Sequence, residues 1–296
     1  MQFAKGHGTG NDFVVLPDVA DELTLTPALV RALCDRRTGI GADGVLRVVR
    51  GDSGRWFMDH HNADGSIAEM CGNGIRLYAR WLVDAHLAAP GELVVETRGG
   101  PKRLQVPTIG DVTVDMGTPT VSQVPHTVHA AGSRAGIAID MGNPHVVARV
   151  VSGELATLDL TLSPRVEPPF PQGVNVELIE LTGPSSLRLR VHERGVGETA
   201  SCGTGACAAV VAAARWAGWD PSSGPAEWDV AVPGGDLVVT WTGQTLLLRG
   251  PAEIVATGEV HLAALHANAW SAPAARDTLA GRGAPHRGVA PVPSVV

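Results

Sequence analysis

Two cysteines of the chain stand in the same four-residue pattern, which is the strongest chemical signal in the sequence. Cys71 opens Cys-Gly-Asn-Gly and Cys202 opens Cys-Gly-Thr-Gly. Each pattern runs into a segment of helical composition, and a helix N-terminus offers unpaired N–H groups and partial positive charge to a carboxylate. The same field should lower the pKa of a thiol placed there. One such unit alone fits a nucleophile, a redox thiol or an inert residue.

The spacing between the two patterns recurs elsewhere and indicates an internal duplication. The cysteines are 131 residues apart. Other polar landmarks keep nearly the same offset: Asn62 with Glu193 and Gly44 with Asn175 at 131, and Gly10-Asn11 with Gly142-Asn143 at 132. Landmarks that recur in order predict two similar domains whose equivalent loops face one cleft. Two facing Cys-Gly units would hold one carboxylate from both sides and place a sulfur on each face of the adjacent carbon.

This arrangement suits inversion of a carbon centre beside a carboxylate. An α-carbon proton is a very weak acid, so its removal requires a close base and stabilisation of the charge that develops. Inversion also requires an acid on the opposite face, and a thiolate and a thiol can exchange these roles. The two helix ends would supply the stabilising donors, so the pattern predicts chemistry that needs no metal and no pyridoxal phosphate.

Periodicity predicts few helices and many strands. Helices are expected over residues 26–36, with Thr26 as N-cap and Pro27 at the first helical position, and over 74–85 and 205–216. Alternating segments predict strands over 92–96, 111–115, 187–191 and 236–241. A last strand over about 251–262 is expected to cross back to the first domain. Beyond about Ala264 the chain is rich in Ala, Pro, Gly and Arg and loses its periodicity, which is typical of disorder.

The predicted fold class is α+β, with two pseudosymmetric domains that each form a strand-rich sheet or barrel around a central helix. The active site is expected in the cleft between them. Residues 1–117 with about 251–263 form the expected N-terminal domain, residues 118–250 the C-terminal domain, and residues 264–296 a disordered tail. A length of 296 residues fits two domains at about 150 residues each.

Composition excludes several classes of function. The chain has 23 basic and 30 acidic residues and a net charge of −7, which disfavours nucleic acid as a partner. The longest apolar helical run, residues 206–214, is too short to span a membrane, which takes about 20 residues. The N-terminus has no apolar core of a secretory signal, and four cysteines are too few for a disulfide framework. A cytoplasmic location is therefore expected.

Several motifs together resemble those of the diaminopimelate epimerase family, and they occur in family order over residues 1–262. They are HGTGNDF (7–13), GIGADG (39–44), HNADGS (61–66), CGNGIR (71–76), MGNPH (141–145), GVNVE (173–177) and HERGVGETASCGTGACA (192–208). The last of these is the most specific. The resemblance implies cofactor-independent interconversion of LL- and meso-diaminopimelate, a step toward lysine and peptidoglycan precursors, and it allows a homodimer.

The resemblance also implies roles for individual residues. Cys202 would be the base toward the LL isomer and Cys71 the opposing acid, with His145 and Glu193 near the thiols. The reacting carboxylate would receive backbone amides from Gly72, Asn73, Gly203 and Thr204, where Thr in place of Ser matters little for a backbone donor. The substrate, above all its distal end, would be held by Asn11, Asn62, Asn143, Asn175 and Arg194. Gly44 departs from the pattern, since many members have Gln there, so water or a neighbour must replace that contact.

Plainer interpretations apply to other residues. Cys34 and Cys207 lie among apolar residues and are expected to be core thiols. His7, His60, His61 and His192 lack the spacing of a metal site, so no metal is expected. Two alternatives for the whole protein stay open: a related two-cysteine amino-acid racemase such as a proline-type racemase, and a dithiol redox protein. The partner expected of an epimerase or racemase is a small molecule, with no role for nucleic acid or membrane.

Overall fold

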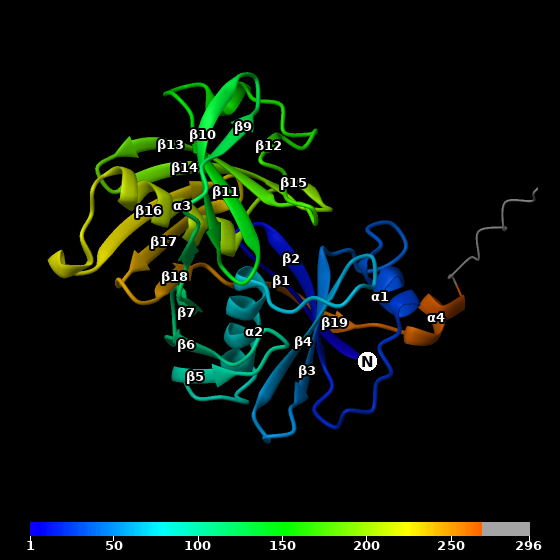
Figure 1. The fold of residues 1–296 in the computed structure, drawn as a ribbon. Helices are drawn as coiled ribbons and strands as arrows, with labels where there is room; N and C mark the ends of the chain where they lie inside the picture. The colour runs from blue at the N-terminus through cyan, green and yellow to red at the C-terminus, as the bar shows by residue number, and fades with distance from the viewer. Residues whose placement is uncertain (268–296) are drawn as a thin grey trace, which may run out of the picture.

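A computed structural model gives the fold of the chain and describes residues 1–267 (Figure 1). The helices are α1 (Pro27–Cys34), α2 (Gly72–Asp84), α3 (Gly203–Trp216) and α4 (Leu262–Ala267), with 3-10 turns at Leu155–Thr157 and Pro221–Ser223. A five-stranded sheet has the order β19-β1-β2-β3-β4, and a larger sheet of 14 strands contains the others. Strands therefore dominate, and the structure confirms the predicted α+β class.

The strands have the following bounds. The smaller sheet contains β1 (Gln2–Gly8), β2 (Asn11–Pro17), β3 (Gly44–Arg50), β4 (Trp56–Asn62) and β19 (Glu253–Glu259). The larger sheet begins with β5 (Gly91–Val95), β6 (Lys102–Val106), β7 (Val112–Gly117), β8 (Thr120–Val121), β9 (His126–His129), β10 (Ser133–Asp140) and β11 (Pro144–Arg149). It continues with β12 (Arg165–Glu167), β13 (Asn175–Gly183), β14 (Ser186–Glu193), β15 (Gly197–Thr199), β16 (Ala226–Val232), β17 (Gly235–Trp241) and β18 (Leu246–Gly250).

Each half of the chain wraps its strands around one buried helix. In the first half β1, β2, β3, β4, β6, β7 and β19 contact α2, and in the second half α3 contacts β10, β11, β13, β14, β16, β17 and β18. Helix α3 is rich in alanine and buried from Ala206 to Ala214, since small side chains let strands approach it from every side. Residues of both helices, among them Ile75 and Ala209, belong to one hydrophobic core cluster.

The strand register shows that the two halves are built alike. Strands β2 and β3 are parallel with Phe13 opposite Gly44, and strands β11 and β13 are parallel with His145 opposite Asn175. These residue pairs keep the offsets of about 131 seen in the sequence. The duplication therefore extends to the pairing of individual residues, so a side chain in one half can be compared with its counterpart in the other.

The chain passes between the halves more than once. Strand β19 returns from the C-terminal half to pair antiparallel with β1, and β18 pairs with β7, which joins β5–β7 to the larger sheet. The predicted boundary at residue 117 therefore falls between β7 and β8, two strands of the same 14-stranded sheet. The division of the chain into domains at residues 117 and 250 stays a prediction.

The expected start of the tail is wrong by a few residues. Residues 262–267 form α4, and Leu265 is buried in a cluster with Val14 and with Leu29, Val30 and Leu33 of α1. The helix forms because these apolar side chains cover the outer face of the smaller sheet, a tertiary contact that composition alone does not reveal. The remainder of the predicted tail lies outside the described residues.

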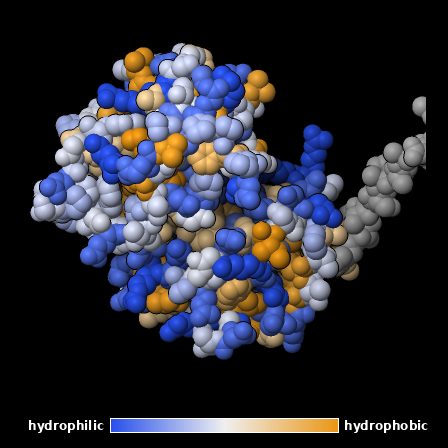
Figure 2. Space-filling model, in the orientation of Figure 1, coloured by the Kyte–Doolittle hydropathy of each residue, from blue (hydrophilic) through white to orange (hydrophobic). Residues whose placement is uncertain are grey.

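Two further features of the molecule are the length of its helices and the polarity of one face. Within residues 1–267 no helix combines the length and apolarity needed to cross a bilayer. Figure 2 shows hydrophilic side chains over most of one face, with apolar side chains in separate small patches.

Candidate active site

Both cysteines of the repeated pattern are helix N-caps. Cys71 precedes α2 and its Sγ accepts the N–H of Gly74 at 3.5 Å, while Cys202 precedes α3 and its Sγ accepts the N–H of Gly205 at 3.4 Å. The helices thus begin two residues earlier than periodicity predicted. The cause is local, because glycines carry no apolar pattern but tolerate the first helical turn when a side-chain cap supports it.

The first turns of the two helices touch each other. A Cβ added to Gly203 would lie 3.3 Å from the Cα of Gly72, and one added to Gly72 would lie 3.5 Å from the Cα of Gly203. A side chain at Gly203 would therefore require the backbone at Gly72 to move by a few tenths of an ångström, whereas one at Gly72 would only be in van der Waals contact. The N-terminal amides of both helices, including those of Asn73 and Thr204, therefore converge from opposite directions on one region that carries two helix-end fields of the same sign.

Around Cys71 the contacts come from the first half of the chain. The Cys71 thiol donates to Asn11 Oδ1 at 3.5 Å, and Asn73 Nδ2 donates to the same oxygen at 3.4 Å. Asn11 Nδ2 donates in turn to Asp43 at 2.9 Å, and Gly10 before it has φ 79°. Asn11 thus fixes the thiol of Cys71 in this structure.

Around Cys202 the contacts come from the second half. The sulfur lies 3.5 Å from Thr204 Oγ1, and Asn143 Nδ2 donates to that hydroxyl at 3.5 Å. Asn143 Oδ1 faces His145 Nε2 at 2.9 Å. The charge of Glu193 also acts on Cys202, and Thr199 donates to this carboxylate through a hydrogen bond of 2.5 Å. The hydroxyl of Thr204, a group that Ser also carries, thus lies between Asn143 and the sulfur of Cys202.

The expected lowering of the cysteine pKa values is wrong. Burial raises the pKa of Cys71, and the bonds from the amides of Gly74 and Asn73 offset this only in part. Burial also raises the pKa of Cys202 well above its usual value, and the charge of Glu193 adds to the effect. Desolvation of a thiolate outweighs the field of a helix terminus here, so both thiols are protonated in the resting protein.

The pKa of Glu193 is itself raised by burial, even though Thr199 donates a hydrogen bond to it. A carboxylate of raised basicity beside a thiol can accept the proton of that thiol. His145 is fully buried and pairs with Asn143 and, through Nδ1, with Glu177 at 2.7 Å. Its predicted position near a thiol is thus realised through Asn143 rather than by a hydrogen bond to sulfur.

Two buried charged residues near the thiols were absent from the predicted site. Arg76 has no exposed surface and donates to the carbonyl of Gly72 and to Asn73 Oδ1, both at 3.1 Å. Burial lowers the pKa of Arg76 to about 10, and its charge lowers the pKa of Cys71. Glu177 is the second. Both lie inside quoted motifs, CGNGIR and GVNVE, but only the fold shows that they point inward.

The residues expected to bind the distal end of the substrate are less closely grouped than those around the two thiols. Asn175 is buried and its Oδ1 accepts the backbone N–H of Arg194 at 2.8 Å. The Arg194 guanidinium is exposed, donates to the carbonyl of Gln172 at 3.3 Å and lines a cavity of about 340 Å³ with Arg165 and His192. Within residues 1–267 the Arg194 guanidinium donates to this carbonyl and forms no ion pair with a carboxylate.

Asn62 and Gly44 sit at the corresponding place in the first half. They are opposite each other in β3 and β4, and exposed Asn62 donates to Ser66 Oγ at 3.0 Å. A Cβ at Gly44 would lie 2.7 Å from the carbonyl oxygen of His61. The backbone therefore leaves no room for a side chain at Gly44, which explains why glycine stands there in this protein.

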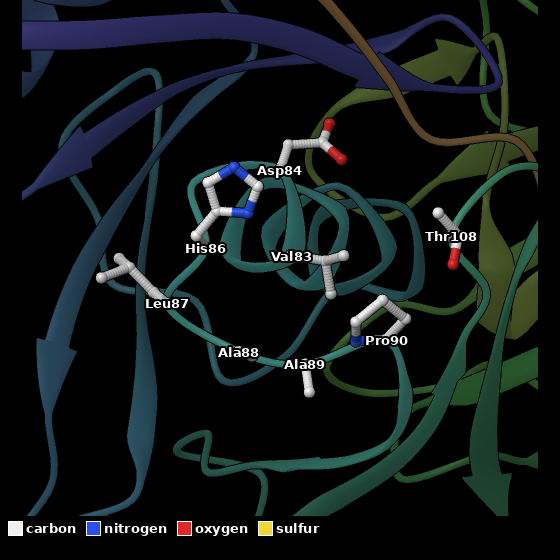
Figure 3. A pocket seen from close by; sticks show the side chains of 8 residues that line it. All are labelled: Val83, Asp84, His86, Leu87, Ala88, Ala89, Pro90 and Thr108. Atoms are coloured by element: carbon white, nitrogen blue, oxygen red, sulfur yellow. The ribbon is translucent and has the colours of Figure 1, made fainter.

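A larger cavity lies at the far end of α2. It measures about 710 Å³ and is lined by Val83, Leu87, Pro90 and Thr108, with Asp84 and His86 at its edge (Figure 3). Cys71 caps the opposite end of this helix of 13 residues, roughly 20 Å away at the usual rise per residue. The cavity is therefore separate from the thiols.

The two remaining cysteines have the positions expected of core thiols. Cys34 is the last residue of α1 and is buried in the cluster beside it, and Cys207 is fully buried on α3. Within residues 1–267 no group of three or more His, Cys, Asp or Glu side chains is arranged to hold a metal ion.

Solved structures share this fold. A Bacillus anthracis phenazine biosynthesis protein of the PhzF family superposes with a TM-score of 0.69 at 17% identity, covering 88% of this chain and 99% of that one. A hydroxyproline epimerase from Agrobacterium vitis superposes with a TM-score of 0.63 at 14% identity, covering 87% and 91%. These structures show that the fold of two similar halves is shared, and the paired Cys-capped helices lie within that fold.

Sequence comparison identifies one family. The chain is 46% identical to the diaminopimelate epimerase of Acidothermus cellulolyticus, covering 90% of this chain and 97% of that protein. It is 48% identical to that of Streptomyces coelicolor, covering 88% and 95%. The family model for diaminopimelate epimerase matches residues 3–122 and 137–262. The chain belongs to the diaminopimelate epimerase family.

The closeness of the two helix starts carries a prediction about oxidation. Mild oxidant should join Cys71 and Cys202 in a disulfide and abolish activity, and dithiothreitol should restore it. In the structure both are free thiols. Peptide mass mapping of the inactive protein identifies the oxidised residues. If only Cys34 or Cys207 is oxidised in inactive protein, the proposed pairing is incorrect.

Proposed function

We propose that the protein converts LL-2,6-diaminopimelate to meso-diaminopimelate with Cys71 and Cys202 as the two acid–base groups. The observation that carries the proposal is the contact between Gly72 and Gly203, which brings two Cys-capped helix N-termini together. A carboxylate bound by amides of both first turns has its α-carbon between the two sulfurs. The converging N–H groups then stabilise the charge that builds on the carboxylate oxygens as the α-proton leaves.

The high pKa values of the thiols require a step that forms the thiolate. In this proposal Glu193 accepts the Cys202 proton, and the resulting thiolate removes the α-proton from the LL isomer. Cys71 then donates its proton to the opposite face of the carbon and becomes a thiolate, which regains a proton after release of the product while Glu193 loses one. Closure around the substrate excludes water and strengthens each of these interactions.

The substrate has a second amino-acid end, and the proposal assigns it to the side chains around Arg194. A guanidinium without a protein carboxylate matches the planar carboxylate of the substrate in a bidentate geometry. Asn62, Asn143 and Asn175 supply further polar contacts, while Asn11 orients Cys71. A small substrate without a distal charge would leave this set unpaired, which favours diaminopimelate over proline-type substrates.

The test is incubation with LL-diaminopimelate in D2O without added cofactor, followed by separation of the stereoisomers. The proposal expects meso product with deuterium at the inverted α-carbon, because both faces exchange through thiols. Exchange on proline but not on diaminopimelate would favour the alternative racemase. Absence of α-carbon exchange on any amino acid, with reversible thiol oxidation intact, would favour the dithiol redox alternative.

The proposal also includes location and assembly. A cytoplasmic enzyme fits four cysteines that are all free thiols, since a reducing compartment keeps them so. A homodimer is proposed on the basis of the family resemblance, and the molar mass of the protein in solution, measured by light scattering, tests it. The partner is the small-molecule substrate, with no role for nucleic acid or membrane.

Catalysis should be independent of metal and of carbonyl cofactors. Of the two lysines in the chain, Lys5 pairs with Asp12 at 2.5 Å and Lys102 lies on β6, so neither is placed beside the thiols. EDTA and hydroxylamine should therefore leave the rate unchanged. Strong inhibition by EDTA that added metal reverses would contradict this expectation.

A further inference from the structure

The two halves of the molecule differ in what packs beneath their Cys-capped helices. Under α2, a Cβ on Gly74 would lie 3.3 Å from both Phe13 and Leu46. Under α3, a Cβ on Gly205 would lie 2.7 Å from Glu177 Oε1. An apolar support in the first half is thus matched by a carboxylate in the second.

Register shows that these residues are true counterparts. Leu46 is opposite Val15 in the β2–β3 pair, and Glu177 is opposite Val147 in the equivalent β11–β13 pair. Phe13 lies two residues before Val15 in β2, and His145 lies two residues before Val147 in β11. The duplication has therefore placed a Glu–His pair where the other half has Leu and Phe.

The Glu–His pair is completely enclosed. Both side chains have 0% exposure, and His145 Nδ1 lies 2.7 Å from Glu177 Oε1. Glu177 Oε2 has no hydrogen-bond partner within the described residues. A buried carboxylate is costly unless a positive charge neutralises it, and one residual unpaired oxygen increases that need. A stability role alone would be served better by the apolar pair of the other half.

The other nitrogen of the ring starts a chain of hydrogen bonds that ends at a thiol. His145 Nε2 lies 2.9 Å from Asn143 Oδ1, an acceptor, so both ring nitrogens face an oxygen atom, an arrangement that a ring with a proton on each nitrogen would satisfy. Asn143 Nδ2 then donates to Thr204 Oγ1 at 3.5 Å. Because that oxygen accepts from Asn143, its own proton is available for Cys202 Sγ at 3.5 Å.

We propose that Glu177 is a positioning residue for the Cys202 half of the reaction: it holds His145 as an imidazolium, and the chain through Asn143 and Thr204 donates to the Cys202 sulfur. This inference deepens the proposed function and rests on it. A donor aimed at sulfur stabilises the thiolate relative to the thiol. Cys71 has no such chain in the described structure, where its thiol donates to Asn11 instead.

The first test compares the pH dependence of alkylation at each thiol by iodoacetamide, read by peptide mass spectrometry. The titratable and charged groups near Cys202 are Glu193 on β14, Glu177 on β13 and His145 on β11. The negative charge of Glu177 by itself raises the pKa of Cys202, so loss of that charge alone would move the Cys202 profile to lower pH. The proposal expects the opposite, because Glu177→Gln also removes the imidazolium that the carboxylate holds, and with it the hydrogen-bond chain that donates to the sulfur. The Cys202 profile should therefore move to higher pH while that of Cys71 stays in place. When the midpoint of such a profile rises by about one on the pH scale, the thiolate fraction at neutral pH falls about tenfold, so kcat/KM should fall about tenfold or more.

Matched variants separate positioning from structural support. Glu180→Gln removes another buried carboxylate of β13, one that accepts from Ser152 and Gly153, and should change neither profile. Thr204→Val should move the Cys202 profile in the same way, and Thr204→Ser should restore the wild-type profile. Should Glu177→Gln fail to fold, the double variant His145→Phe with Glu177→Leu copies the packing of the first half and should show the same selective change at Cys202.

Two alkylation results would overturn the inference. One is a Cys202 profile that stays unchanged or moves to lower pH in Glu177→Gln, and the other is an equal displacement of both thiol profiles, which indicates a general structural effect. A ring-nitrogen NMR spectrum of the wild-type protein should also show His145 doubly protonated at neutral pH, and a neutral ring would contradict the chain. Alkylation and NMR do not require turnover, so failure of the proposed function is distinguishable from failure of this inference.

Discussion

Replacing either Cys71 or Cys202 by alanine should lower the rate of epimerisation by at least about 10³-fold while the protein stays folded. Inversion needs a base on one face and an acid on the other, so the loss of either thiol stops the same reaction. The structural cost is modest, because each cysteine caps its helix through one N–H bond to sulfur, and removal of an N-cap costs about 1 kcal/mol. The measurement is kcat/KM in both directions, with circular dichroism and thermal unfolding as checks on the fold.

Cys34→Ala is the matched control, since Cys34 is the buried last residue of α1 and lies in a different core cluster from the two Cys-capped helices. It should keep wild-type turnover. If Cys71→Ala or Cys202→Ala retains turnover close to that of the wild type, the two-base mechanism is incorrect. If one of the two variants fails to fold, the other still tests the mechanism, because the proposal requires both thiols for the same reaction.

The second large effect concerns the length of the substrate. We expect kcat/KM for L-lysine to be lower than that for LL-diaminopimelate by about 10⁴ or more. The Arg194 guanidinium is exposed in this structure, but closure around the substrate would bury it, and a buried polar group left without its partner is costly. Lysine keeps the distal amine but lacks the distal carboxylate that the Arg194 guanidinium would bind. Arg194→Lys should lower kcat/KM for LL-diaminopimelate by at least about tenfold, since a point charge does not reproduce a bidentate fork.

Arg165 provides the control for this experiment. It lines the same cavity as Arg194, but its guanidinium already pairs with Glu167 at 2.5 Å and it is exposed. Arg165→Lys should therefore leave the preference for diaminopimelate intact. Comparable kcat/KM values for lysine and diaminopimelate, or a clear preference for proline, would overturn the role given to Arg194.

Much of the fold follows from signals that are local in the sequence. Thr26 and Pro27 start α1 as predicted, because a capping hydroxyl and a fixed proline φ act within one turn. The repeated Cys-Gly pattern placed both cysteines at helix N-termini for the same reason. The offset of about 131 residues predicted the duplication, and the strand register confirms it residue by residue.

Other features depend on contacts between residues far apart in the chain, which no local pattern encodes. The thiol pKa values are raised rather than lowered because burial by strands from both halves outweighs the helix field. Pairing of β18 with β7 carries one sheet across the predicted boundary. Sequence alone thus determined which residues cap the helices and which family the motifs resemble. Only the tertiary structure decided that Arg76 and Glu177 point inward, because burial of a charge depends on the residues that enclose it.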